Sequence, residues 1–372
     1  MSRTEPMSKR AGISFGALEA SIADRIFDIL APKKLAPHKR LVPLLRINKH
    51  WHTLAARRMY TSISVKGQWI SRPLRKTLEA NGALAALVTE LVLDTELSAQ
   101  DPHETRDHIR IVAACPNLQS LTVLGYAPND VDSYRAAIGS RFSLEALNIS
   151  EGAGMFTPSQ LLDMLSSWPK LEKLVLKDAL LPASESGNAS SKAKAKSPSR
   201  IPCKTLKMAK LLDDFNPATQ FSFPDFATLT PCLAVLWVEP HGAMPLDLKD
   251  GLSLWAPTLE TLCALSETEL HLETVLPQFT RLKHIDTWSQ MLSPRSVQHI
   301  PPTVQMLTYR IFPAQLLDLS ETLFSSTVAS SLKAVTIKGA IPPGKQTPMQ
   351  FTPTAIQSVK TVCRQRRIRL TI

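Results

Sequence analysis

Two closely spaced histidines, His50 and His52, have the proximity of a metal-ligand pair. They flank Trp51, and side chains two residues apart on a helix point in different directions. Gly152-Ala-Gly154 lacks the third glycine of a dinucleotide-binding loop. The sequence also contains no Gly-x-x-x-x-Gly-Lys-Ser/Thr, His-Glu-x-x-His or Cys-x-x-Cys pattern. We therefore expect no catalytic residues, no metal, no cofactor and no enzymatic activity of the chain itself.

A repeated apolar motif, Leu-x-x-Leu-x-Leu, predicts where the strands of the chain lie. Five copies begin two residues after a proline: Pro116 with Leu118, Leu121 and Val123; Pro169 with Leu171, Leu174 and Leu176; Pro231 with Leu233, Leu236 and Val238; Pro257 with Leu259, Leu262 and Ala264; Pro302 with Val304, Leu307 and Tyr309. The end of the motif alternates, so its last two apolar residues point to one side of an extended strand. Each proline disfavours helix just before it and so ends the preceding segment.

Five further copies lack the proline and begin at Val88, Leu144, Cys203, Leu282 and Leu332. The ten copies recur at a mean step of about 27 residues. Helical patterns lie between them. The clearest starts at Thr157-Pro158, a hydroxyl N-cap with proline at the first helical position, and Thr352-Pro353 repeats it near the C-terminus. Such spacing indicates stacked units that each supply one strand and one helix.

This pattern resembles the leucine-rich-repeat family. The resemblance implies an α/β solenoid of about ten units. The family's asparagine, three residues past the motif, is replaced in the first four copies by Glu96, Tyr126, Gly152 and Ala179. The steps vary from 22 to 32 residues, so we expect an irregular solenoid. An ordinary α/β chain with leucine-rich buried strands is the alternative.

The segment from residue 17 to residue 60 has a helical pattern and no copy of the motif. Its first apolar face contains Ile22, Ile26, Phe27, Ile29 and Leu30. A second apolar segment runs from Leu41 to Ala55, ahead of the first expected strand at Tyr60–Val65. So short a block buries little of its own surface, and it therefore needs a partner or a neighbouring domain.

The order Ile-x-x-x-Ile-Phe-x-x-Leu, Pro, Leu-x-x-Leu-Leu-x-Ile-x-Lys-x-Trp-x-x-Leu-Ala in this block resembles an F-box. The next residues, Tyr-x-Ser-Ile-x-Val, resemble the linker strand of fungal F-box proteins with leucine-rich repeats. The Leu-Pro opening of the family motif is Leu18-Glu19 here. The resemblance implies a surface for a Skp-type adaptor formed by Ile22, Ile26, Phe27, Leu30, Pro32, Leu41, Leu44, Leu45 and Trp51. The alternative is a helical hairpin that caps the solenoid.

The same resemblance implies a function: the substrate-recognition subunit of a Skp–cullin–F-box (SCF) ubiquitin ligase, active in protein degradation in the cytoplasm, the nucleus or both. The adaptor would connect the chain to a cullin, and the solenoid would bind an unknown target protein. The expected organisation is a disordered tail over residues 1–16, an F-box-like helical domain over 17–60 and a solenoid over 61–372. A repeat scaffold without a ligase role and a nucleic-acid-binding protein are the alternatives.

The positive charge of the chain is concentrated at its N-terminal end. The formal net charge is +11, and residues 1–60 contain twelve Lys/Arg against four Asp/Glu. Nucleic acid, anionic lipid and an acidic protein are all partners for such a segment, and the adaptor of the family is acidic. A second basic cluster, at residues 364–369, lies near the C-terminus. Since neither cluster has a nucleic-acid-binding motif with interleaved aromatics, a protein partner is favoured.

Other features fit an intracellular, membrane-free protein. The five cysteines are odd in number and dispersed, as expected of buried thiols in a reducing compartment. No apolar run approaches the roughly 20 residues that span a bilayer. Residues 183–200 contain no large apolar side chain, so we expect a disordered insertion in the solenoid there.

The concave surface of the solenoid is the expected site for the target, because strands line it. In each motif the residue between the last two apolar positions faces this surface; in order these are Val92, Thr122, Asn148, Val175, Lys207, Trp237, Cys263, Asp286, Thr308 and Thr336. Aromatic anchors often dominate binding energy, so Trp237 is the first candidate contact. Glu239, His241, Asp286 and Trp288 are expected to extend its patch. Packing of Trp237 against a neighbouring strand, or under the insertion at residues 183–200, is the equal alternative.

Overall fold

The computed structural model describes most of the chain from residue 41 onward. The described residues are 22, 25, 26, 29, 41–94, 102–125, 131–141, 143–150, 158–177, 200–211, 222–240, 247–266, 269–325, 331–340 and 350–372. The expected tail at residues 1–16 and residues 183–199 of the expected insertion lie outside them. So do four of the candidate site residues (Phe27, Leu30, Pro32 and His241) and the four positions where the repeat asparagine is replaced.

Twelve strands form one parallel sheet in chain order. Their bounds are β1 (Ser62–Lys66), β2 (Glu90–Asp94), β3 (Ser120–Leu124), β4 (Ala146–Ser150), β5 (Lys173–Lys177), β6 (Thr205–Leu211), β7 (Val235–Pro240), β8 (Thr261–Ala264), β9 (His284–Trp288), β10 (Met306–Ile311), β11 (Ala334–Gly339) and β12 (Arg369–Thr371). The ten motif copies supply β2 to β11, one strand each. The expected α/β fold, with a solenoid-like alternation of strands and helices, is therefore confirmed.

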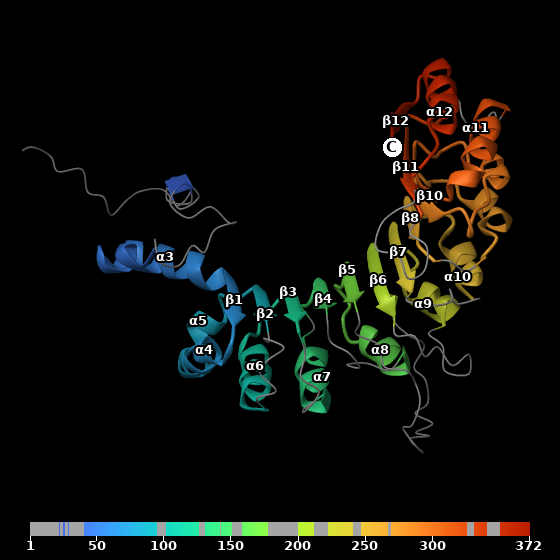
Figure 1. Cartoon of the computed structure of the whole chain (residues 1–372). Helices are drawn as coiled ribbons and strands as arrows, with labels where there is room; N and C mark the ends of the chain where they lie inside the picture. The colour runs from blue at the N-terminus through green and yellow to red at the C-terminus, as the bar shows by residue number, and fades with distance from the viewer. Residues whose placement is uncertain are drawn as a thin grey trace, which may run out of the picture.

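The helices that connect the strands lie on the outer side of the curved sheet, and the strands line its inner side (Figure 1). The α-helices are α3 (Lys49–Thr61), α4 (Gln68–Ala80), α5 (Gly82–Ala85), α6 (Pro102–Ala114), α7 (Val131–Gly139), α8 (Pro158–Leu165), α9 (Phe223–Leu229), α10 (Leu248–Trp255), α11 (Leu316–Ser325) and α12 (Pro353–Gln365). Helix α12 begins as the sequence predicts, because the Thr352 hydroxyl accepts from the Ala355 N–H at 3.4 Å.

Between β8 and β10 the expected helix of each unit is not an α-helix. The described residues there contain only short 3₁₀-helices: η5 (Leu272–Thr274), η6 (Leu276–Gln278) and η7 (Arg295–His299). The other 3₁₀-helices are η2 (Val42–Arg46), ahead of α3, and η8 (Pro313–Gln315), ahead of α11. The repeat steps that begin at Leu259 and Leu282 are the shortest, 23 and 22 residues. They leave too few residues for a full α-helix and its two turns, so the tighter helix replaces it.

The core is built from rows of apolar side chains that stack from strand to strand. One row consists of residues paired in register: Ile63, Leu91, Leu121, Leu147, Leu174, Leu206, Leu236, Leu262, Ile285, Leu307 and Val335. All of these side chains are buried. Because side chains alternate along a strand, the residue after each of them faces the inner side of the sheet. The motif thus determines both the core and the exposed face.

Helices α9 and α10 approach each other so closely that only glycine fits at one position. A Cβ added to Gly251 would lie 2.7 Å from the Cβ of Phe223 and 3.1 Å from its backbone carbonyl. Gly251→Ala should therefore lower the free energy of unfolding by about 2 kcal/mol, because overpacking outweighs the gain in helix propensity. Gly82→Ala, with nothing within 4 Å of the added carbon, should instead raise it by about 0.5 kcal/mol. Urea denaturation measures both changes, and equal signs would contradict the close approach.

Candidate functional site

The N-terminal head consists here of η2, α3 and the described residues before them. Its small core contains the buried side chains of Leu41, Trp51 and Ala55. The partly buried residues packed against this core are Ile26, Leu44, Leu45, Leu54 and Met59. Helix α3 begins at a proper cap, since the Asn48 side chain accepts from the Trp51 N–H at 3.0 Å. The head is therefore a separate apolar cluster that precedes β1.

The residues expected to bind an adaptor fall into an inner and an outer group. Leu41 is fully buried and Trp51 is 6% exposed, so both hold the head together from inside. Leu44 and Leu45 are half-buried and Ile22 is exposed, so these three reach the surface. The structure adds Val42 and Ile47, which are 40% and 55% exposed. Sequence reasoning missed both as site residues, although they lie inside the apolar segment that suggested the head.

All the formal charges of residues 41–61 are positive. This segment contains Arg46, Lys49, Arg57 and Arg58 and no Asp or Glu. The cations lie on η2 and α3; the exposed Val42 also lies on η2, and Ile47 lies between the two helices. A surface of this kind is complementary to a partner that combines apolar and acidic side chains.

The inner face of the sheet carries the row of residues expected from the motif. The register aligns Val92, Thr122, Asn148, Val175, Lys207, Trp237, Cys263, Asp286, Thr308 and Thr336 one after another from β2 to β11. Eight are half-buried, whereas Cys263 and Asp286 are buried. The strand register therefore confirms the predicted row as a continuous line from β2 to β11.

Trp237 is held by two charged neighbours on this face. The Lys207 ammonium on β6 lies 5.2 Å from the centroid of the Trp237 ring, a cation–π contact. The indole N–H donates to Glu239 Oε2 at 3.3 Å. Glu239 lies two residues further along β7, so its side chain is on the same face. These contacts fix a half-buried aromatic ring before any ligand binds.

Asp286 and Trp288 lie on β9, separated from Trp237 by β8 alone. Two strand spacings amount to about 10 Å. Burial raises the pKa of the Asp286 carboxyl, opposed by Arg310, whose Nε lies 3.8 Å from Asp286 Oδ1. Trp288 is aligned with Arg310 in the sheet and packs partly against the core. The candidate target residues Trp237, Glu239, Asp286 and Trp288 are thus brought together, while His241 lies outside the described residues.

His284 completes this part of the inner face. Its Nε2 lies 3.3 Å from the Thr308 hydroxyl, and burial lowers its pKa although Asp286 opposes the shift. Sequence reasoning missed His284 as a site residue. The signal that could have found it is its position two residues before Asp286, which places both side chains on one side of β9.

Two kinds of reactive group, a metal centre and a cysteine thiolate, would give the described residues a catalytic role. Among them no group of three or more His, Cys, Asp or Glu side chains could hold a metal ion. Burial raises the pKa of Cys115 to about 11 and that of Cys203 to about 12, which suppresses their thiolates. One Gly-x-Ser-x-Gly pattern does occur, at residues 12–16, outside the described residues. No apolar segment precedes it to form the strand that a nucleophile elbow requires.

Known proteins do not identify the family of this chain. No protein-family model matches the sequence, and no curated protein matches it significantly. None of the helices in the described ranges is long and apolar enough to cross a membrane.

Proposed function

We propose that this protein is the substrate-recognition subunit of an SCF ubiquitin ligase. The head would bind a Skp-type adaptor, and the inner face of the sheet would bind a target protein. The observation that carries the proposal is the combination of two surfaces on one chain: an apolar, basic head and a strand-lined inner face with a preformed Trp237 cluster. The F-box-like order of residues in the head supports the choice of adaptor.

The proposed mechanism is proximity. A receptor of this class holds the target near a ubiquitin-conjugating enzyme that other subunits recruit, and so raises the effective concentration of target lysines. The chain itself would supply binding surfaces and no reacting group. The Lys207–Trp237–Glu239 contacts fit this role, because a ring already held in place loses little conformational entropy when a target binds.

The exposed apolar residues of the head provide the sharpest test. We expect the Val42→Glu/Ile47→Glu double variant to lose adaptor binding by at least about a hundredfold, because two apolar contacts are lost and two acidic side chains face an acidic partner. Both residues are exposed, so the head should stay folded. Pull-down of the purified full chain with a recombinant Skp-type adaptor, followed by titration, measures the loss.

Trp237→Ala is the matched control, since it alters the inner face and leaves the head unchanged. It should bind the adaptor as well as the natural chain does. Equal adaptor binding by the head variant, or no binding by the natural chain, would refute the ligase proposal and favour a scaffold. Co-purification of a cullin from a native extract is the second readout that separates a ligase subunit from a scaffold.

A further inference from the structure

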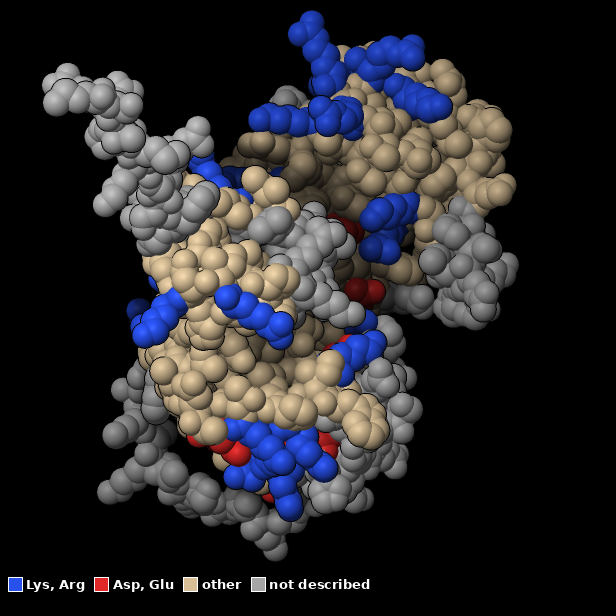
Figure 2. All heavy atoms as spheres, turned by 90° about the vertical axis from the view of Figure 1, so that its left-hand side faces the viewer, with Lys and Arg blue, Asp and Glu red and all other residues tan. Residues whose placement is uncertain are grey.

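A cavity lined almost entirely by charged side chains lies between α4 and α6, on the outer side of the sheet. Its volume is about 340 Å³, and it is lined by Arg72, Arg75 and Lys76 from α4 and Arg106, Asp107 and Arg110 from α6. Residues three and four apart share a helix face, so Arg72, Arg75 and Lys76 form one side of the cavity. In Figure 2, Lys and Arg side chains gather at the bottom of this end of the molecule, where Figure 1 places α4 and α6.

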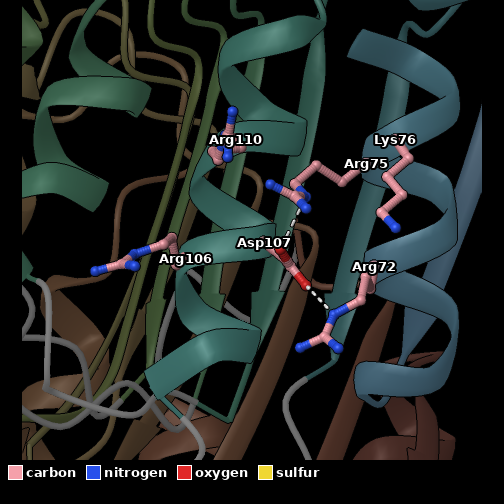
Figure 3. A pocket seen from close by; sticks show the side chains of 6 residues that line it. All are labelled: Arg72, Arg75, Lys76, Arg106, Asp107 and Arg110. Carbon is pink, nitrogen blue, oxygen red and sulfur yellow. Dashed lines mark ion pairs between the residues drawn. The ribbon is translucent and has the colours of Figure 1, made fainter. Parts of the chain in front are cut away.

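Asp107 is the acidic centre of the cavity. It is 6% exposed, and Arg75 Nε lies 2.9 Å from Asp107 Oδ1. Arg72 Nε lies farther away, 3.8 Å from Asp107 Oδ2. Figure 3 shows Arg72 and Arg75 directed toward Asp107, whereas Arg106 extends away from it. The Arg75–Asp107 pair is therefore structural, and Arg72 is the arginine on α4 that is available to a ligand.

The cations of the cavity outnumber the carboxylates beside them. Apart from Asp107, the acidic partner of the cluster is Glu79, whose Oε1 lies 2.7 Å from Arg110 Nε. Five cationic side chains thus meet two carboxylates, an excess of three positive charges. Lys76 has no ion-pair partner among the described residues. The other titratable pair of α6, Glu104 and His108, is buried and does not line the cavity.

Like charges one helical turn apart repel each other, so the excess positive charge favours the binding of an anion in this cavity. Arginine forks match the geometry of phosphoryl oxygens and bind them in pairs. One phosphoryl group carries at most two negative charges and leaves part of the excess uncompensated. We propose that the cavity between α4 and α6 binds a small soluble anion that carries two or more phosphoryl groups. Its size falls in the range of about 300–1,000 Å³ that small-molecule pockets occupy.

Inorganic pyrophosphate is the probe, titrated calorimetrically into the full chain at low ionic strength. The test variant is Arg72→Gln/Lys76→Gln, which removes two cations and leaves the Arg75–Asp107 pair intact. We expect pyrophosphate to bind the natural chain and to bind this variant at least about tenfold more weakly, because charge-assisted hydrogen bonds are lost. Orthophosphate should bind the natural chain more weakly than pyrophosphate.

The control is Arg364→Gln/Arg369→Gln, which changes the net charge equally at the other end of the sheet. It should bind pyrophosphate like the natural chain, and thermal melting establishes that both variants are folded. No binding to the natural chain, or equal losses in the two variants, would overturn the proposal. A phosphoserine peptide separates the sources of the phosphoryl group: tighter binding of the peptide than of pyrophosphate would overturn the assignment to a small ligand.

Discussion

Replacing Trp255 with alanine should lower the free energy of unfolding by about 4 kcal/mol, the largest stability change expected of any single substitution discussed. Trp255 is fully buried where α9 and α10 pack together. Its ring meets Phe223 and Phe226 edge-on, with centroids 6.4 and 6.3 Å away. Its indole N–H donates to the Thr230 carbonyl at 3.0 Å. Alanine would therefore leave a cavity, lose two aromatic contacts and remove a buried hydrogen bond, although the Thr230 carbonyl would still accept from the Leu233 N–H.

Chemical denaturation of the full chain measures this loss, and Trp69→Ala is the control. Trp69 is 86% exposed, so its removal should change stability by less than about 0.5 kcal/mol. Because each unit of a solenoid contacts mainly its neighbours, hydrogen exchange should accelerate first in β7, β8 and the helices beside them. Equal effects of the two tryptophan substitutions, or faster exchange confined to β2–β4, would contradict this account of the core.

The strand register is the part of the fold that the sequence predicts best. The last two apolar positions of each motif are two residues apart, and a strand has the same period, so one alignment determines core and surface together. That is why Trp237 and Asp286 could be placed on one face before the structure was known. The short repeat steps between β8 and β10 predict an irregular solenoid, but step length alone does not specify that 3₁₀-helices replace the α-helices there.

Contacts between side chains of different units could not be predicted in this way. Lys207 reaches the Trp237 ring only because β6 and β7 are adjacent, and the choice of rotamer depends on both strands. Arg75 and Asp107 belong to helices separated by β2 and its connections. Neither helix sequence alone predicts this ion pair, because a single Arg or Asp on a helix is usually exposed to solvent. In the head, periodicity identified Leu41 and Trp51 as apolar but could not distinguish an inner residue from a surface one.

His108 should make the stability of the protein fall as the pH drops from about 6.5 to about 4. Burial lowers its pKa to about 4 from an ordinary value of 6.5, even though Glu104 Oε1 lies 3.7 Å from its Nε2. Between these two values the unfolded chain binds a proton at His108 and the folded chain does not. Unfolding therefore takes up a proton, and acid favours it by a total of about 3 kcal/mol from this residue. Well above pH 6.5 and well below pH 4 the contribution no longer changes.

The measurement is the free energy of unfolding at several pH values, for the natural chain and for His108→Leu. The variant should lose most of the slope in this window, whatever its stability at pH 7. Burial raises the pKa of Asp247 and Asp286. Protonation of these two carboxyls in acid therefore stabilises the folded chain, so their contribution to the slope of stability against pH has the opposite sign to that of His108. Comparing slopes between the two chains cancels them. His299→Leu, at an exposed position, should keep the natural slope; if it flattens the profile as much as His108→Leu, the buried imidazole is not the cause.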